Sequence, residues 1–182
     1  MADDNFLLTV FAGSWREYQD HLTASLAPLT AEQLALRAAP GLRSIGENAL
    51  HIVGCRMHWF SGFLGEEGGA EMTAYGPWNE VALGAPYAGW EAVARALGAP
   101  SPPTGAALAG GIDRTWRFMT DCLARWGSTG LRQTFPDVAE DGTSVEIPRA
   151  WVVWHVLEHD LHHGGELSLT LGMHGIPAEF AV

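Results

Sequence analysis

The chain has 182 residues, of which 47% are hydrophobic, and its 21 acidic side chains outnumber 10 basic ones to give a net charge of −11. This surplus of negative charge opposes binding to nucleic acid and to anionic membrane surfaces, so we expect neither as a partner. Two cysteines, an acidic N-terminal segment and no apolar stretch near 20 residues lead us to expect a soluble, cytoplasmic protein with residues 1–182 in a single domain.

The first third of the chain predicts two long helices with a short one between them. Apolar residues spaced three and four apart mark an amphipathic helix over 3–27. The segment 30–33 begins with Thr and ends with Gln, the spacing of a capping box, and predicts a short turn of helix. Ser44 and Glu47 repeat this spacing, so they are expected to open a second helix over 44–64.

The middle of the chain predicts a long connection followed by a third helix. Residues 65–103 are rich in Gly, Pro and Ala, which indicates irregular structure apart from a short helix near 87–97. Apolar residues at helical spacing then mark a helix over about 106–126. Long connections often line functional sites, so the segment before this helix is of interest.

The last third predicts a small hairpin and a fourth long helix. The segments 131–135 and 143–147 have strand composition and flank a turn signal. Pro148 is expected in the first turn of the final helix, and Gly172 near its end. The fold class is therefore all-α, most simply a four-helix bundle with a small β-hairpin before the last helix.

The final helix carries the strongest chemical signal in the sequence. Five side chains able to bind a metal or to form hydrogen bonds fall on one stripe roughly 80° wide: His155, His159, His163, Glu166 and Thr170. Apolar residues flank this stripe, with Trp151 and Leu169 expected on one side and Val156 and Leu167 on the other. His162 lies off the stripe and is expected to orient a neighbour or to face solvent.

The opposite face of the same helix is also apolar, because Trp154, Leu157 and Leu161 point away from the histidines. A helix with apolar residues on two opposite faces needs a packing partner on each of them. We expect its own domain to cover one face and a second copy of the chain to cover the other, so a homodimer is predicted.

The second helix contains a similar polar stripe of four side chains: Glu47, His51, Cys55 and His58. Two helices that each present such a stripe within an apolar shell are typical of a metal site in a bundle core. Histidines four residues apart leave the same helix face and can bind one ion. The central members of the two stripes, His51, His159 and His163, are therefore the predicted metal ligands.

The remaining members of the stripes have alternative explanations. His58 or His155, taken alone, is more often a hydrogen-bonded core residue than a ligand. Cys55 is expected to be a small core residue rather than a ligand for a soft metal. Glu47 and Glu166 are either hydrogen-bond acceptors for a metal-binding imidazole or, equally, helix-cap and surface groups.

The segments 155–171 and 44–60 together resemble two regions of the DinB superfamily, its C-terminal histidine signature and its upstream metal-binding helix. The resemblance extends over the whole order of helices. It implies a four-helix bundle that is commonly dimeric, with His51, His159 and His163 at the three metal-ligand positions.

The sequence departs from the family pattern directly after the last of these histidines. The family usually has Arg-Gly-Gln there, whereas this chain has Gly164, Gly165 and Glu166. A cation is thus replaced by glycine and an amide by a carboxylate. Adjacent helical glycines cost about 1 kcal/mol each relative to alanine, so we expect a compensating close contact with a neighbouring element.

Three neutral imidazoles leave a coordination position open on Zn²⁺ or Ni²⁺, the two metals expected, which is typical of a catalytic site. The resemblance implies a thiol transferase or isomerase in which the metal lowers the pKa of bacillithiol, mycothiol or glutathione, which then attacks a small-molecule substrate. Glu166 or His155 would accept a proton or orient a ligand. Three arginines are candidates for binding an anionic thiol: Arg43, Arg114 and Arg149.

Two other functions remain open at this point. The same site suits a metal-dependent hydrolase with Glu166 or Glu47 as its base. It equally suits a non-catalytic metal-binding protein of the stress response that works as a dimer.

Overall fold

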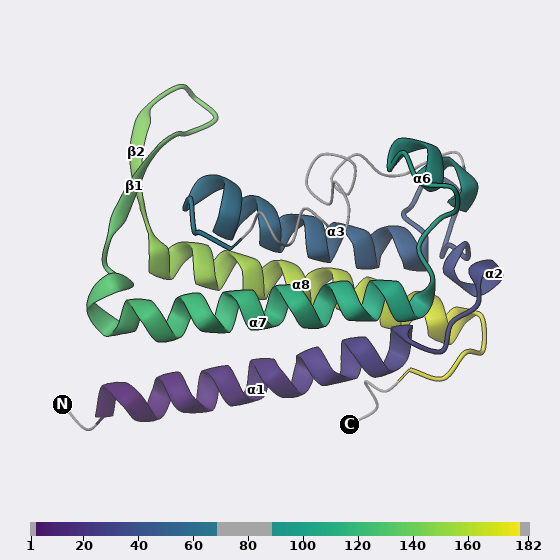
Figure 1. The fold of residues 1–182 in the computed structure, drawn as a ribbon, viewed down its shortest axis with the longest axis horizontal. Helices are drawn as coiled ribbons and strands as arrows, with labels where there is room; N and C mark the ends of the chain where they lie inside the picture. Colours follow the sequence, from purple (N-terminus) through teal and green to yellow (C-terminus); the bar gives the residue numbers. More distant parts are fainter. Residues whose placement is uncertain (1–2, 69–88, 179–182) are drawn as a thin grey trace.

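The computed structural model describes residues 3–68 and 89–178, with a mostly helical fold and one antiparallel pair of strands (Figure 1). Four long helices lie side by side: α1 (Asp3–Leu26), α3 (Ile45–Met57), α7 (Gly105–Gly130) and α8 (Arg149–Met173). Shorter elements lie toward their ends: α2 (Ala31–Leu34), the π-helix η1 (His58–Phe63), α6 (Trp90–Ala96), β1 (Thr134–Val138) and β2 (Ser144–Pro148). The expectation of a helical fold with a small hairpin is confirmed.

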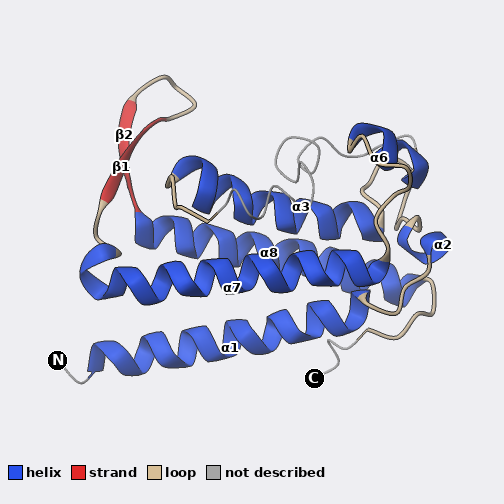
Figure 2. Ribbon diagram, viewed as in Figure 1, coloured by secondary structure: helices blue, strands red, loops and turns tan. Residues whose placement is uncertain are grey.

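The long helices pack in a defined order. α7 contacts both α1 and α3, and α3 also contacts α8. Figure 2 shows the strands extending from one end of these helices, whereas α2 and α6 lie at the other end. Since α3 and α8 are direct neighbours, side chains on their facing sides can meet although they are far apart in sequence.

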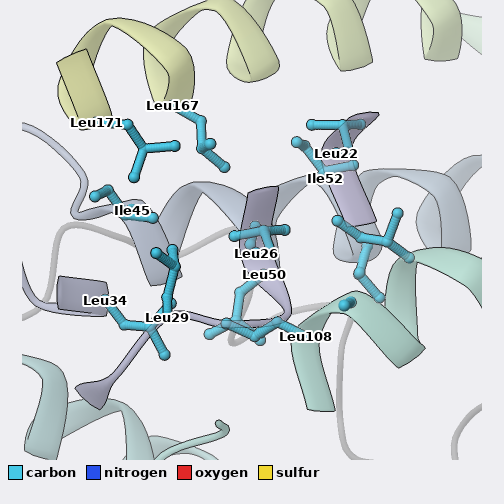
Figure 3. Close-up of a cluster of buried hydrophobic side chains, with 14 of the residues drawn as sticks. Leu22, Leu26, Leu29, Leu34, Ile45, Leu50, Ile52, Leu108, Leu167 and Leu171 are labelled. Carbon is cyan, nitrogen blue, oxygen red and sulfur yellow. The ribbon is translucent and has the colours of Figure 1, made fainter. Parts of the chain in front are cut away.

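Two clusters of buried apolar side chains lie at the two ends of the long helices. The first, shown in Figure 3, draws from the later part of α1, from α3, from the start of α7 and from the end of α8, and includes Leu22, Leu26, Ile45, Leu50, Ile52, Leu108, Leu167 and Leu171. The second includes Trp15, Met57, Phe60, Trp116, Met119, Val152 and Val156. Its members come from the opposite ends of the same helices and from η1.

Local sequence signals account for the helix starts in the first part of the chain. Ser44 Oγ accepts a hydrogen bond from the Glu47 backbone N–H at 3.2 Å, and Glu47 Oε2 accepts one from the Ser44 N–H at 2.8 Å. The same reciprocal pair forms between Thr30 and Gln33 at the start of α2. Both predicted capping boxes are therefore confirmed.

Three predicted boundaries differ from the structure. The second predicted helix divides at His58, where the α-helix becomes the π-helix η1. The third continues beyond residue 126 to Gly130, across a kink at Gly127, whose φ of 56° favours glycine. Pro148 precedes α8 as its N-cap rather than lying in its first turn, because its φ and ψ are those of an extended residue.

The hairpin has the predicted antiparallel pairing, with strands shifted toward the C-terminus by one to three residues. The predicted short helix near 87–97 corresponds to α6, although residues 69–88 of the connection lie outside the described residues. No helix among the described residues combines the length and hydropathy needed to cross a membrane.

Candidate metal centre

Three histidines from two helices meet at the contact between α3 and α8. His51 lies on α3, and His159 and His163 lie one turn apart on α8. Each offers one ring nitrogen such that all three nitrogens lie within 4.8 Å of one another. The ring centroids are 4.7 Å apart for His51 and His159, 4.5 Å for His51 and His163, and 4.4 Å for His159 and His163. The structure thus groups the three residues that the sequence singled out.

A close contact in this group joins His159 Nε2 and His51 Nε2, which are 3.0 Å apart. Two nitrogens that bind one tetrahedral Zn²⁺ at about 2.0–2.1 Å lie about 3.3 Å from each other. The other ring nitrogen of His159, Nδ1, is buried and has no hydrogen-bond partner among the described residues. The nitrogens are therefore spaced as those of a shared ion would be.

Burial favours the neutral, metal-binding form of these rings. It lowers the pKa of His159 to about 2, an effect to which the neighbouring His163 and His51 add. Burial also lowers the pKa of His163, although the hydrogen bond with Glu166 opposes this. Imidazole binds a divalent metal only when neutral. Spacing, burial and donor type of this trio all fit Zn²⁺ or Ni²⁺.

Glu166 supports one of the three rings. Its Oε2 lies 2.8 Å from His163 Nδ1, and since a carboxylate can only accept, Nδ1 carries the proton and Nε2 is left for another partner. Carboxylates in this position fix the tautomer and orientation of metal-binding histidines. The other oxygen of Glu166 lies 3.3 Å from Nε2 of the exposed His162. His162, His163 and Glu166 form a second potential metal group, two of whose members are exposed.

His155 lies next to the trio but is not part of it. Its ring centroid is 6.4 Å from that of His159, and its ring stacks on Trp151 at 4.9 Å with an interplanar angle of 5°. Trp59, from η1, meets the His155 ring edge to face at 4.9 Å. Burial lowers the pKa of His155. One side of the site is consequently aromatic.

The remaining residues of the predicted stripe on α3 do not extend the trio. Both oxygens of Glu47 bind Arg37, at 2.6 and 2.7 Å, in addition to capping the helix. Cys55 is buried, which raises the pKa of its thiol to about 12 and supports its interpretation as a core residue. His58, whose expected place was the core, is instead exposed at the junction of α3 and η1.

The apolar residues predicted beside the histidines are buried on one side only. Val156 and Leu167 are fully buried, whereas Leu169 is 62% exposed and Trp151 is also exposed. On the opposite face of α8, Trp154 and Leu161 remain exposed in the single chain. The expected cover on that face is thus not provided by the chain's own described residues.

The three candidate arginines have different surroundings. Arg149 binds Glu66 at 2.8 Å and lies over the ring of Trp126, near the hairpin. The guanidinium of Arg114, on α7, lies beside Gly110. Arg43 is the one whose charge lowers the pKa of both His159 and His163.

A buried ion pair directly behind the trio was not predicted from the sequence. Asp160, the neighbour of His159, binds Arg56 of α3, and both side chains are fully buried. Arg56 also donates to the Gln19 side chain at 2.6 Å and to the carbonyl of Ile112 at 3.0 Å. Trp15 Nε1 donates to Asp160 at 3.0 Å. This network joins all four long helices between the two apolar clusters.

Comparison with known proteins identifies the family of the chain and a similar fold. Residues 14–167 match the model of the DinB superfamily. The structure is similar to the crystal structure of a DinB-like protein from Bacillus cereus ATCC 10987, with a TM-score of 0.62 over 94% of this chain and 95% of that chain, at 18% sequence identity. An identity this low supports a likeness of fold alone. A search of curated proteins gave no match.

Proposed function

Because the chain belongs to the DinB superfamily, we propose that His51, His159 and His163 hold a divalent metal, Zn²⁺ or Ni²⁺, in a thiol-dependent transferase or isomerase. The observation that carries this proposal is the convergence of three imidazoles from α3 and α8, two of which burial keeps neutral. A metal held by three such ligands would keep an open position and lower the pKa of a bound low-molecular-weight thiol.

The residues around the trio have separate tasks in this proposal. Glu166 holds the Nδ1 proton of His163 and so keeps the opposite nitrogen directed at the metal. Trp59, Trp151 and His155 form an aromatic surface that excludes water beside His159 and contacts the electrophilic small-molecule substrate. His155 is the candidate proton acceptor, because its ring is partly exposed and burial lowers its pKa, leaving it neutral near pH 7.

The proposal includes the wider organisation of the protein. The four long helices are taken as a DinB-like four-helix bundle in one domain of residues 1–182, located in the cytoplasm. The working form is a homodimer, because Trp154 and Leu161 line an apolar groove of 660 Å³ between α1 and α8 that a second copy would cover.

Hydrolysis receives less support than thiol chemistry. A hydrolase of this kind needs a carboxylate free to act as base. Of the two acids suggested by the sequence, Glu47 binds Arg37 and the start of α3, and Glu166 binds His163. Both are therefore already committed to other partners.

The test uses the purified protein loaded with Co²⁺, whose absorption reports a thiolate ligand. Bacillithiol, mycothiol and glutathione are titrated separately, and at least one should produce a new thiolate-to-metal absorption band. The His159→Ala variant should show none. A protein that binds Co²⁺ but responds to none of the three thiols would instead be a non-catalytic metal-binding protein or a hydrolase, and ester and amide substrates would separate these two.

A further inference from the structure

A cavity of 330 Å³ lies close to the histidine trio, between the segment that precedes α3 and the last third of α8, and Glu166, which binds His163, lines it. Polar and apolar side chains line it, among them Leu42, Arg43, Asn48, Glu166, Leu169 and Thr170. Glu166 connects the cavity with the histidine trio, because it lines the cavity and lies 2.8 Å from His163 Nδ1. A molecule in this cavity therefore lies next to Glu166, the hydrogen-bond partner of His163.

Arg43 places a positive charge in the wall of this cavity. Its Nε is buried without a hydrogen-bond partner, and among the described residues Arg43 forms no ion pair. Arg37 and Arg149, by contrast, each bind a glutamate within 2.8 Å. A partly buried guanidinium with unused donors favours an anionic partner, and a carboxylate matches its planar geometry.

Asn48 gives an independent sign that a polar ligand belongs here. It is 3% exposed and lines the cavity, yet its Oδ1 has no hydrogen-bond partner in the described part of the chain. Buried polar atoms are nearly always paired, so an unpaired one facing a cavity indicates a missing partner. An N–H group next to a ligand carboxylate, as in an amino acid or peptide, would supply it.

Among the described residues that line the cavity, Glu166 is the one acidic side chain, and both of its oxygens already have histidine partners. One of its oxygens lies 2.8 Å from His163 and the other 3.3 Å from His162. The repulsion that it would exert on a bound anion is reduced by these contacts. Arg43 is the one positively charged side chain among the described residues that line the cavity.

We propose that this cavity binds the carboxylate of the thiol whose sulfur binds the proposed metal, with Arg43 as its principal partner. The inference rests on the proposed function and narrows it to one class of thiol. Glutathione and bacillithiol carry carboxylates, whereas mycothiol carries none. The site therefore selects an amino-acid-derived, carboxylate-bearing thiol.

The test compares two small thiols of equal size on the Zn²⁺-loaded protein by calorimetry: 3-mercaptopropionate and its uncharged amide. The wild-type protein should bind the carboxylate about tenfold more tightly or better, the effect of one or more hydrogen bonds to a charged group. Arg43→Gln should reduce this preference to less than about twofold, whereas Arg117→Gln, which removes an exposed charge on α7, should retain it.

The outcomes separate the two proposals. Equal affinity for both thiols in the wild type overturns the carboxylate site but leaves the thiol function intact, and this comparison needs no variant. A preference that persists in Arg43→Gln overturns the role of Arg43. Absence of binding by both thiols overturns the thiol function itself, and the carboxylate site with it.

Discussion

Arg56 and Asp160 form a fully buried ion pair, with Arg56 Nη2 2.7 Å from Asp160 Oδ2. The pair lies on α3 and α8, the two helices that carry the histidine trio. Burial raises the pKa of Asp160, and the adjacent Arg56 charge opposes this. Because Asp160 directly follows His159, the ion pair holds α8 against α3 at the level of the proposed metal site.

Breaking this pair should strongly destabilise the protein. In Asp160→Asn the Arg56 charge stays buried without its counter-charge, which costs about 3–5 kcal/mol in comparable cases. Urea unfolding measures the change. Asp113→Asn is the control, because its partner Arg117 is largely exposed and such pairs contribute less than about 1 kcal/mol. A similar small loss in both variants would show that the buried network does not hold the helices together.

Metal binding should depend on the trio and not on the neighbouring group. His51→Ala and His159→Ala should each lose most of a metal content of roughly one ion per chain, measured by elemental analysis of the purified protein. His162→Ala should retain it, since this ring is exposed and outside the trio. Loss of metal in His162→Ala with retention in His159→Ala would instead assign the ion to His162, His163 and Glu166.

Removing Glu166 should weaken metal binding without abolishing it. Glu166→Ala leaves the Nδ1 proton of His163 without its acceptor, and losses of about 10–100-fold in affinity follow from such changes. Glu166→Gln should lose less, because an amide oxygen still accepts this hydrogen bond. Glu158→Ala, an exposed acid on the same helix, is the control. Competition with a chelator measures the affinities, and an unchanged value in Glu166→Ala would remove its supporting role.

The parts of the site that could be predicted are those encoded within single helices. The spacing of His159 and His163 places both on one face of α8, and Ser44 with Glu47 determines where α3 begins. His51 could be added because a central position on one amphipathic helix faces the centre of its neighbour. Each of these inferences needs only helical periodicity and the assumption that the two helices pack together.

The parts that could not be predicted depend on pairing between distant segments. Arg56 and Asp160 are 104 residues apart, and nothing local identifies them as partners. A usable signal did exist for Arg56, since it is the one basic residue of the mostly apolar α3, where an unpaired charge would be expensive. The π-helix at His58 and the cavity at Arg43 likewise follow from tertiary packing, which spacing along the chain does not encode.

Tyr18 should make the protein sensitive to alkali. Burial raises the pKa of its hydroxyl to about 12, whereas the unfolded chain ionises near 10. Above about pH 10 the unfolded state therefore loses a proton that the folded state keeps, and stability falls as the pH rises toward about 12. Urea unfolding at about pH 9 and about pH 11 measures the loss, which should be smaller in Tyr18→Phe. An equal loss of stability in the wild type and in Tyr18→Phe would show that another group causes the sensitivity to alkali.

Gly164 is needed for the contact between α1 and α8. A Cβ built on Gly164 overlaps the Tyr18 hydroxyl and lies 2.9 Å from Tyr18 Cζ, so the glycine that replaces the family's usual Arg permits this close approach. Gly164→Ala should destabilise the protein, because overpacking costs about 1–3 kcal/mol and exceeds the gain in helix propensity. Gly165→Ala is a matched control on the same turn, since its Cβ meets nothing within 4 Å.

The two alanine variants should change stability in opposite directions. Gly165→Ala should gain up to about 1 kcal/mol, the helix propensity of alanine over glycine, so the difference between the variants isolates the steric contact. Adding Tyr18→Phe to Gly164→Ala should recover part of the loss, because it removes the overlapping hydroxyl but leaves Cζ in place. A double-mutant cycle of urea unfolding measures this coupling. If Gly164→Ala stabilised the protein as much as Gly165→Ala, α1 and α8 would not be held at the observed separation, and the glycine would need another explanation.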